Sequence, residues 1–316
     1  MRGNNLKYGL FLAVLLAAFA LMPFVLSRFY LYFLGTILVM GLLATSLNLV
    51  LGYGGMYQFH HAVFYGAGAY AFALATTKGN WPFWASMALA PVFSALLGLL
   101  MGLITVRLNK LYFGMLQISL GSLVWALVYR WYSFTGGDDG IHGVPLPDWL
   151  TTPKATYYFV LVLVTIALFI MFRIVNSPFG KIFQAIRDNP TRSEAIGVNV
   201  ARHQLVGLII AAFFAGIAGA LFVVIEDTAV PDLMFWNLSM EILIMCLLGG
   251  WFSFSGPMLG AAMVMGLRTF AGMFTEYWTL ILGLVLMALI FFLPNGIMGL
   301  FDSKTGHKPA PDLPGA

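Results

Sequence analysis

Long apolar runs separated by short polar segments follow one another along the whole chain. Eight of them are long enough to cross about 30 Å of hydrocarbon as helices, and they cover residues 9–27, 30–50, 57–77, 83–106, 111–131, 155–173, 204–225 and 279–293. Between residues 238 and 270 the turn-rich stretch Gly249–Pro257 interrupts the apolar signal and leaves two shorter halves. The pattern therefore predicts an all-α, polytopic membrane protein with about ten transmembrane segments, including discontinuous short helices.

The composition agrees with this pattern and excludes an ordinary soluble protein. Of the 316 residues, 61% are hydrophobic and 9% are charged, whereas about 25% are charged in a soluble domain. The single cysteine, Cys246, lies in an apolar run, which favours packing over a disulfide or a reactive thiol. Small residues at four-residue spacing, such as Ala212, Gly216 and Ala220, predict helices that pack closely in lipid.

The positions of Lys and Arg predict the orientation. With ten spans and the N-terminus inside, five basic residues lie outside, namely Arg28, Lys78, Arg130, Lys154 and Arg268. Eleven lie inside, namely Arg2, Lys7, Arg107, Lys110, Arg173, Lys181, Arg187, Arg192, Arg202, Lys304 and Lys308. Because basic residues favour the cytoplasmic side, we expect both termini there, with one transmembrane domain over residues 1–301 and a short tail over 302–316. The net charge of +4 then reflects cytoplasmic loops, and we expect no nucleic acid partner.

A glycine-rich polar stretch, Gly52–Ala62, lies where one predicted span ends and the next begins. It contains Gln58, His60 and His61. Irregular backbone at membrane depth is tolerated only where it is buried in protein or lines a wet cavity, and discontinuous helices often build transport sites. The stretch is therefore part of a transport path or an interfacial loop with its histidines at the water boundary. We expect no metal site, because the two adjacent histidines face different ways and no third ligand is evident.

Glu241 is the acidic residue that lies inside a predicted span. A carboxylate in hydrocarbon is costly and is a functional candidate by default. Asn237 and Ser239 precede it, so Glu241 could instead lie in the first turn of its helix and face the positive end of the helix dipole. A capping role and a transport role both stay open.

The longest inner loop, residues 174–203, carries helix start and stop signals. Ser177–Pro178 is a start signal, Asn189–Pro190 is a break, Thr191–Glu194 fits a capping box and Gly197 is a stop signal. The loop therefore predicts two short helices joined by a turn. Such a pair is either a docking device for another protein or a solvated basic loop that sets topology.

Three common sequence motifs of enzymes and nucleotide-binding proteins are absent. The chain contains no G-x-x-x-x-G-K-[ST] phosphate loop, no H-E-x-x-H pair and no G-x-S-x-G elbow. ATP hydrolysis by a phosphate loop is therefore excluded, and an intramembrane enzyme is disfavoured. Energy for transport would come from a partner or from an ion gradient.

Several motifs, in their order and spacing, resemble those of the permease subunits of branched-chain amino-acid ABC importers, specifically the LivM-type subunit. The resemblance covers about residues 40–301. It rests on Leu47–Gly55, His61–Tyr70, Thr135–Ile141, Phe179–Lys181, Ala185–Asn189, Glu194–Gly197, Glu241–Leu243, Leu248–Gly250 and Leu293–Gly296.

The resemblance implies an ABC importer permease fold and a transport subunit that is not an enzyme. A second homologous permease would complete the path, two cytoplasmic ATPases would bind ATP and Mg, and a periplasmic solute-binding protein would deliver branched-chain or related amino acids. This chain itself would bind no cofactor. The implied location is the bacterial inner membrane, in contact with the lipid bilayer.

The resemblance also implies that the loop over residues 178–197 couples the permease to an ATPase. The coupling candidates are Lys181, Arg187, Asp188, Glu194, Ala195 and Gly197. Among them we expect Arg187, Asp188 and Glu194 to hold the shape of the loop and to make polar contacts with the ATPase.

The chain departs from the family pattern at positions that bear on the cargo. Where the family often has Gln, Ser and Gly after Gly55, this chain has Met56, Gln58 and His60, and Gln117 and Ser122 stand where the family tends to have Thr and Glu. The candidate path residues are Gln58, His60, His61, Gln117 and Glu241. Urea, amides or small carboxylates are alternative cargoes, and a secondary transporter coupled through Glu241 is an alternative mechanism.

Overall fold

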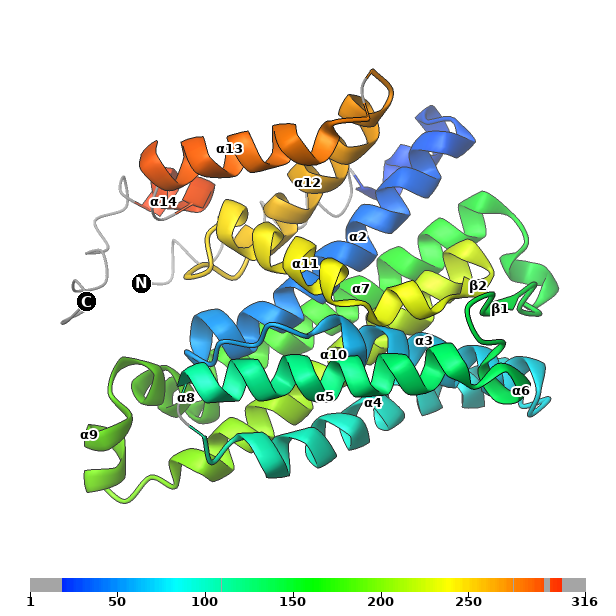
Figure 1. Cartoon of the computed structure of the whole chain (residues 1–316). Helices are drawn as coiled ribbons and strands as arrows, with labels where there is room; N and C mark the ends of the chain where they lie inside the picture. Colours follow the sequence, from blue (N-terminus) through cyan, green and yellow to red (C-terminus); the bar gives the residue numbers. More distant parts are fainter. Residues whose placement is uncertain (1–18, 109, 275, 293–295, 303–316) are drawn as a thin grey trace.

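Helices make up nearly all the regular structure of the computed structural model, which describes residues 19–108, 110–274, 276–292 and 296–302 (Figure 1). The elements before residue 176 are α2 (Arg28–Asn48), the π-helix η1 (Leu49–Tyr53), α3 (Ala62–Thr77), α4 (Phe83–Thr105), α5 (Lys110–Arg130), α6 (Tyr132–Thr135), β1 (Ile141–His142), η2 (Asp148–Leu150) and α7 (Pro153–Val175). The later ones are α8 (Pro178–Asp188), α9 (Pro190–Ala195), α10 (Val200–Glu226), β2 (Thr228–Ala229), η3 (Pro231–Met234), α11 (Trp236–Gly249), α12 (Gly256–Gly272), α13 (Trp278–Phe292) and α14 (Gly296–Asp302).

Helices lie at the predicted spans. Among the described residues, the helices long and apolar enough to cross a membrane are Arg28–Tyr53, Phe83–Thr105, Leu111–Arg130, Pro153–Val175 and Val200–Glu226. The shorter helices α3 and α11 are also apolar, and α11 and α12 are separated at the predicted break. The all-α, multi-pass membrane architecture is therefore confirmed. Most of the predicted first span, the tail and the Leu293–Gly296 motif lie outside the described residues.

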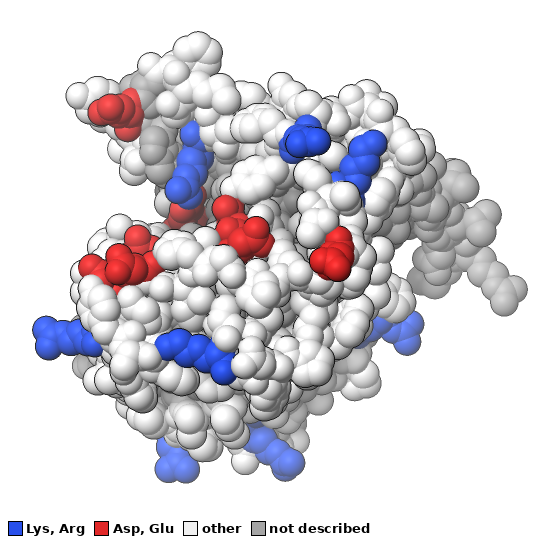
Figure 2. Space-filling model, turned by 90° about the vertical axis from the view of Figure 1, so that its right-hand side faces the viewer, with Lys and Arg blue, Asp and Glu red and all other residues white. Residues whose placement is uncertain are grey.

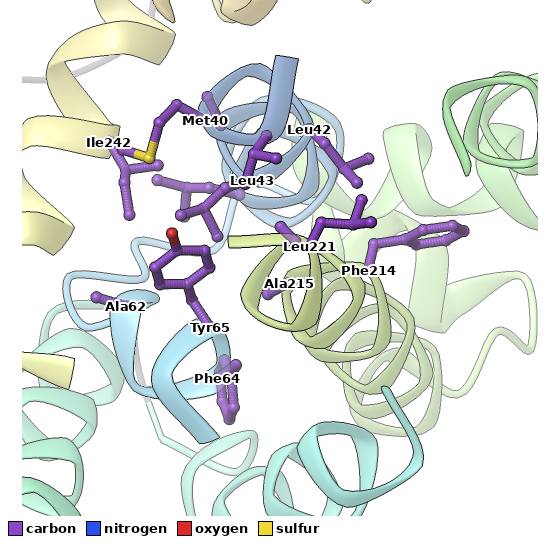
Figure 3. Packing of buried hydrophobic residues seen from close by; sticks show 14 of the residues in the cluster. Met40, Leu42, Leu43, Ala62, Phe64, Tyr65, Phe214, Ala215, Leu221 and Ile242 are labelled. Carbon is purple, nitrogen blue, oxygen red and sulfur yellow. The ribbon is translucent and has the colours of Figure 1, made fainter. Parts of the chain in front are cut away.

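The helices α2, α3 and α10 form the centre of the bundle, and α4, α7, α11 and α12 pack around them. Figure 3 shows Leu43 of α2, Tyr65 of α3 and Leu221 of α10 in this core. All three side chains are fully buried, as is Cys246 of α11. The segment containing α2 is 89% buried over its most apolar window, which explains why it is apolar on every face.

Small residues bring α3 and α10 into direct backbone contact. A Cβ atom at Gly68 would lie 2.5 Å from the Cα of Gly216, and one at Gly219 would lie 2.0 Å from the carbonyl oxygen of Tyr65. A larger side chain at either position would push the two helices apart. The predicted close packing along the stripe of small residues is therefore present.

The bundle has two different ends (Figure 1). One carries α8 and α9, and we call it the α8–α9 end. The other carries α6 and the antiparallel pair of β1 and β2, in which Ile141 lies opposite Ala229, and we call it the β1–β2 end. Figure 2 views this second end and shows acidic side chains gathered on it. The acidic residues of the loops and helix ends there are Asp138, Asp139, Asp148, Glu226, Asp227 and Asp232.

Candidate functional site

The segment between η1 and α3 is not helical, and we call residues 54–61 the break segment. The chain leaves η1 at Tyr53, Gly55 has φ +64°, and α3 begins only at Ala62. Glycine adopts this left-handed conformation at little cost, so Gly55 lets the chain turn off the helix axis. The predicted span from residue 57 therefore becomes helical only at residue 62. A π-helix next to such a break is frequent at functional sites.

Two other helices hold the start of α3. The Nε2 of His61 lies 2.8 Å from the Oγ of Ser46 in α2, and the Oγ of Ser239 in α11 accepts a hydrogen bond from the backbone N–H of Ala62 at 2.9 Å. His60 is 1% exposed and His61 is 0% exposed. The histidines are thus buried inside the protein, so the alternative of an interfacial loop with histidines at the water boundary is wrong.

The break segment lies along one face of α5, where two glycines permit close contact. A Cβ atom at Gly114 would lie 2.7 Å from the ring of Phe59, and one at Gly121 would lie 2.5 Å from the Cγ of His60. Gln117 is three residues from the first glycine and four from the second, so it shares their face of the helix. The fold thus places His60 against the face of α5 that also carries Gln117, although the two residues are far apart in the sequence.

Three buried polar residues of the break segment and of this face of α5, Gln58, His60 and Gln117, are what we call the polar cluster. Within the described part of the chain, both amide atoms of Gln58, the Nδ1 of His60 and the Oε1 of Gln117 have no hydrogen-bond partner. The Nε2 of Gln117 donates to the Oγ1 of Thr105 at 3.0 Å. An unpaired buried polar group costs about 1–3 kcal/mol, so this many in one place calls for a functional explanation.

Glu241 belongs to a different arrangement. Its helix, α11, begins at Trp236 and has no acidic residue in its first turn, so the capping interpretation of Glu241 is wrong. The carboxylate instead pairs with the guanidinium of Arg268 in α12 at 3.4 Å, and the Glu241 side chain is 14% exposed. No group of three or more His, Cys, Asp or Glu side chains suited to a metal ion occurs among the described residues.

The helices α8 and α9 are the two short helices predicted in the loop over residues 174–203. The Oγ of Ser177 accepts a hydrogen bond from the N–H of Gly180 at 3.4 Å, and Pro178 occupies the first turn of α8. Gly197, with φ +89°, follows the end of α9. The predicted start and stop signals are therefore confirmed.

The cap of α9 differs from the predicted one. The helix begins at Pro190, and the Oδ1 of Asn189 accepts a hydrogen bond from the N–H of Arg192 at 2.8 Å. The predicted capping box over Thr191–Glu194 is wrong, because Thr191 already lies inside the first turn. Asn189 thus lies at the end of α8 and also caps the start of α9.

Phe183 anchors α8 on the bundle. Its ring is fully buried and lies 2.3 Å from the position that a Cβ atom would take at Gly54, and 2.4 Å from that at Gly207. The opposite face of α8 and the tip of the loop are exposed. The exposed residues include Lys181, Asp188, Glu194, Ala195, Ile196 and Gly197.

Arg187 connects α8 to both helix breaks. One of its terminal nitrogens donates to the carbonyl oxygen of Gly52 in η1 at 2.8 Å, and its guanidinium carbon lies 5.4 Å from the centre of the Phe252 ring, in the turn between α11 and α12. It also pairs with Asp188 at 2.8 Å. Arg187 thus points toward the bundle, whereas Asp188 and Glu194 are exposed.

Comparison with known proteins identifies the architecture. A family model described as the permease component of branched-chain amino-acid transport systems matches residues 29–290. The chain belongs to this permease family. No solved structure matches it.

Two curated branched-chain amino-acid permeases match nearly the whole chain. This chain is 28% identical to the high-affinity branched-chain amino acid transport system permease protein LivM of Salmonella typhimurium, over 94% of this chain and 76% of that protein. The LivM protein of Escherichia coli strain K12 is 27% identical with the same coverage. A probable branched-chain amino acid transport permease protein LivM of Methanocaldococcus jannaschii is 23% identical over 43% of this chain and 41% of that protein. The resemblance seen in the motifs is confirmed.

Some contacts of this permease site have no local signal in the sequence. The bond from Arg187 to Gly52 joins positions 135 residues apart, and the bond from Ala62 to Ser239 joins positions 177 residues apart. The interrupted apolar pattern marks both breaks, but nothing in it shows that they meet beside α8.

Replacing Asn189 with Ala should loosen α9, because it removes the oxygen that binds the N–H of Arg192. Such a change costs about 0.5–2 kcal/mol, so we expect several-fold faster hydrogen exchange over residues 190–196, measured by mass spectrometry. Glu194→Ala is the matched control in the same helix and should leave the exchange unchanged. Equal acceleration of exchange by both substitutions would support the predicted capping box over Thr191–Glu194 instead of the Asn189 cap.

Proposed function

We propose that this chain is the transmembrane permease subunit of an ATP-driven importer of branched-chain or related amino acids. Family membership supports the transport role. The α8–α9 pair supports the ATP-driven role. It is attached to both helix breaks through Arg187, and in the loop after α9 the side chain of Ile196 is 76% exposed. An exposed apolar side chain on such a loop suits contact with a protein partner.

The energy source and the delivery of cargo lie on partners. A second homologous permease would complete the path, and two cytoplasmic ABC ATPases would bind ATP and Mg, since this sequence has no phosphate loop. A periplasmic solute-binding protein would deliver the amino acid at the β1–β2 end. In this arrangement the α8–α9 end and both termini are cytoplasmic, which fits the excess of Lys and Arg there.

Arg187 and Phe183 would transmit the movement of an ATPase to the membrane segments. Arg187 binds the carbonyl of Gly52 and lies on Phe252, so a displacement of α8 shifts η1 and the α11–α12 turn together. Discontinuous helices that move as a unit are a recurring device of alternating access. Arg187 is a positioning residue in this proposal, and Lys181, Asp188, Glu194, Ala195 and Gly197 face the ATPase.

The polar cluster is the proposed cargo path in its closed state. Separation of the break segment from α5 would give Gln58, His60 and Gln117 water or solute as partners for their unpaired atoms. The Nε2 of His61 bonds Ser46 in α2 and the Glu241 carboxylate pairs with Arg268 in α12, so we assign both residues to positioning the helices. The Nδ1 of His61 has no partner among the described residues. Because the cluster offers neutral donors and acceptors, amides or urea are the second candidate cargo.

Affinity purification of the tagged chain from its native membrane should recover two ABC ATPases and a second permease, detected by mass spectrometry. Ile196→Asp should lose the ATPases and keep the second permease, because a charge replaces an exposed apolar contact. Ser133→Asp, exposed near the β1–β2 end, should change neither. Recovery of the chain without an ATPase, even after crosslinking within residues 178–197, would favour a gradient-driven carrier with Glu241 as its coupling carboxylate.

Arg187→Ala should uncouple ATP hydrolysis from transport. The ATPases should stay bound because the exposed face of α8 is unchanged, while amino-acid uptake into proteoliposomes falls at least tenfold per ATP hydrolysed. Arg173→Ala, an exposed cation at the same end of the bundle, should leave the ratio unchanged. A normal ratio in Arg187→Ala would show that the link to Gly52 carries no coupling.

Gln58→Leu should reduce transport without reducing the stability of the protein. Removing two unpaired buried polar atoms should raise or preserve the thermal unfolding temperature, while the uptake rate falls at least tenfold because the path loses a polar group. Gln204→Leu, at a half-buried position of α10, is the control and should preserve uptake. If Gln58→Leu lowered stability and left uptake intact, Gln58 would be a structural residue.

A further inference from the structure

A cavity of about 630 Å³ lies at the β1–β2 end, between the starts of α2 and α7, the end of α10 and the loop over residues 144–151. Its volume falls in the range of about 300–1,000 Å³ that is usual for small-molecule sites. No residue of α5 or of the break segment lines it. The cavity is therefore separate from the polar cluster.

Two opposite charges line this cavity, and neither has an ion-pair or side-chain hydrogen-bond partner in the part of the chain that the structure describes. Arg28 is the first residue of α2, and Asp227 directly follows α10. A helix carries a partial positive charge at its N-terminal end and a partial negative charge at its C-terminal end. The positive Arg28 thus lies at the positive end of α2, and the negative Asp227 lies at the negative end of α10. Both placements are electrostatically unfavourable.

The carboxylate of Asp227 has no local structural role. The residue has φ +54° at a helix end, where glycine or asparagine is usual, and partial burial raises the pKa of its carboxyl group. The adjacent Glu226 accepts a hydrogen bond from Tyr32. The backbone of Asp227 is held by Val144, whose N–H donates to its carbonyl at 3.1 Å. The fold thus fixes the backbone of Asp227 at the rim of the cavity. Asp227 and Arg28 are both exposed, and the Asp227 carboxylate has no side-chain partner among the described residues.

Aliphatic side chains form a large part of the remaining wall, and their buried members include Leu31, Val144, Leu150, Val160 and Val224. Aromatic and hydroxyl side chains complete the lining, namely those of Phe29, Tyr32, Tyr157, Thr151 and Thr156. The cavity therefore has a positive charge at Arg28, a negative charge at Asp227 and a mainly apolar wall with some hydroxyl groups. Since Arg28 and Asp227 form no ion pair with each other, a ligand that carries both charges would satisfy both groups.

We propose that this cavity binds a zwitterion with an aliphatic group, such as leucine, as a receiving site on the permease itself. The ligand carboxylate meets Arg28 and the positive end of α2, the ammonium meets Asp227 and the negative end of α10, and the side chain contacts the aliphatic wall. The choice of an amino acid rests on the proposed function. A zwitterionic phospholipid headgroup has the same charges, so the test separates these two sources.

The test measures ligand binding to the full-length chain in nanodiscs of phosphatidylglycerol by isothermal titration calorimetry. The probes are leucine, 4-methylpentanoate, which lacks the ammonium, and isopentylamine, which lacks the carboxylate. Wild-type protein should bind leucine at least tenfold more tightly than either analogue. Arg28→Gln should remove the advantage of leucine over the amine, and Asp227→Asn should remove its advantage over the acid.

Matched controls separate the site from a general charge effect. Lys154→Gln and Asp148→Asn change charges at the same end of the bundle but outside the cavity lining, and they should leave leucine binding unchanged. Arg28→Lys should keep part of the affinity. Every variant should unfold at or above the wild-type temperature, because the neutral variants remove charges that oppose a helix dipole. If either neutral variant fails to fold, Arg28→Lys and Asp227→Glu test the same two positions.

Three results would overturn the proposal. One is no leucine binding at millimolar concentration, and another is binding that Arg28→Gln and Asp227→Asn leave intact. The third is loss of leucine binding in phosphatidylethanolamine nanodiscs together with Arg28-dependent retention of that lipid in native mass spectrometry, which would make the lipid the occupant. ATP-driven uptake by the assembled importer is scored separately, so leucine binding without uptake would contradict the proposed function and leave the site standing.

Discussion

Every helix break inside this bundle leaves backbone groups that cannot bond along their own helix, and lipid offers them no partner. The architecture follows from how distant residues satisfy them. Ser239 of α11 binds the free N–H of Ala62, Arg187 of α8 binds the carbonyl of Gly52, and Asn48 of α2 donates to the carbonyl of Ser253 at 3.1 Å. These bonds tie the two discontinuous regions of the permease to each other.

Because the same bonds include α8, this helix is joined directly to both discontinuous regions. The Phe183 ring fills the space above Gly54, and Arg187 lies between Gly52 and Phe252. The exposed face of α8 stays free for a partner. The polar cluster, which lies on α5 next to the same break, is therefore placed where a movement that begins at α8 would open a contact between helices.

The helix termini of this bundle are used in two ways. Side-chain oxygens cap helix starts at both ends, Ser177 and Asn189 at the α8–α9 end and Thr152 at the start of α7, as expected for elements that need to be stable. At the β1–β2 end, Arg28 and Asp227 oppose the dipoles of their own helices and line a cavity. Charges placed against the local field are better explained by a ligand than by stability.

The sequence alone determined the membrane class, the approximate positions of the described spans and the short helix pair, because apolar periodicity and Ser, Asn, Pro and Gly signals act over a few residues. It misplaced the cap of α9 by choosing Thr191 over Asn189, and it left open a first-turn position for Glu241, whose helix begins five residues earlier. Only the tertiary structure decided that Glu241 pairs with Arg268, that His60 lies on Gly121 and that Arg187 holds Gly52. Those contacts join residues far apart in the chain, and their energies depend on which helices lie side by side.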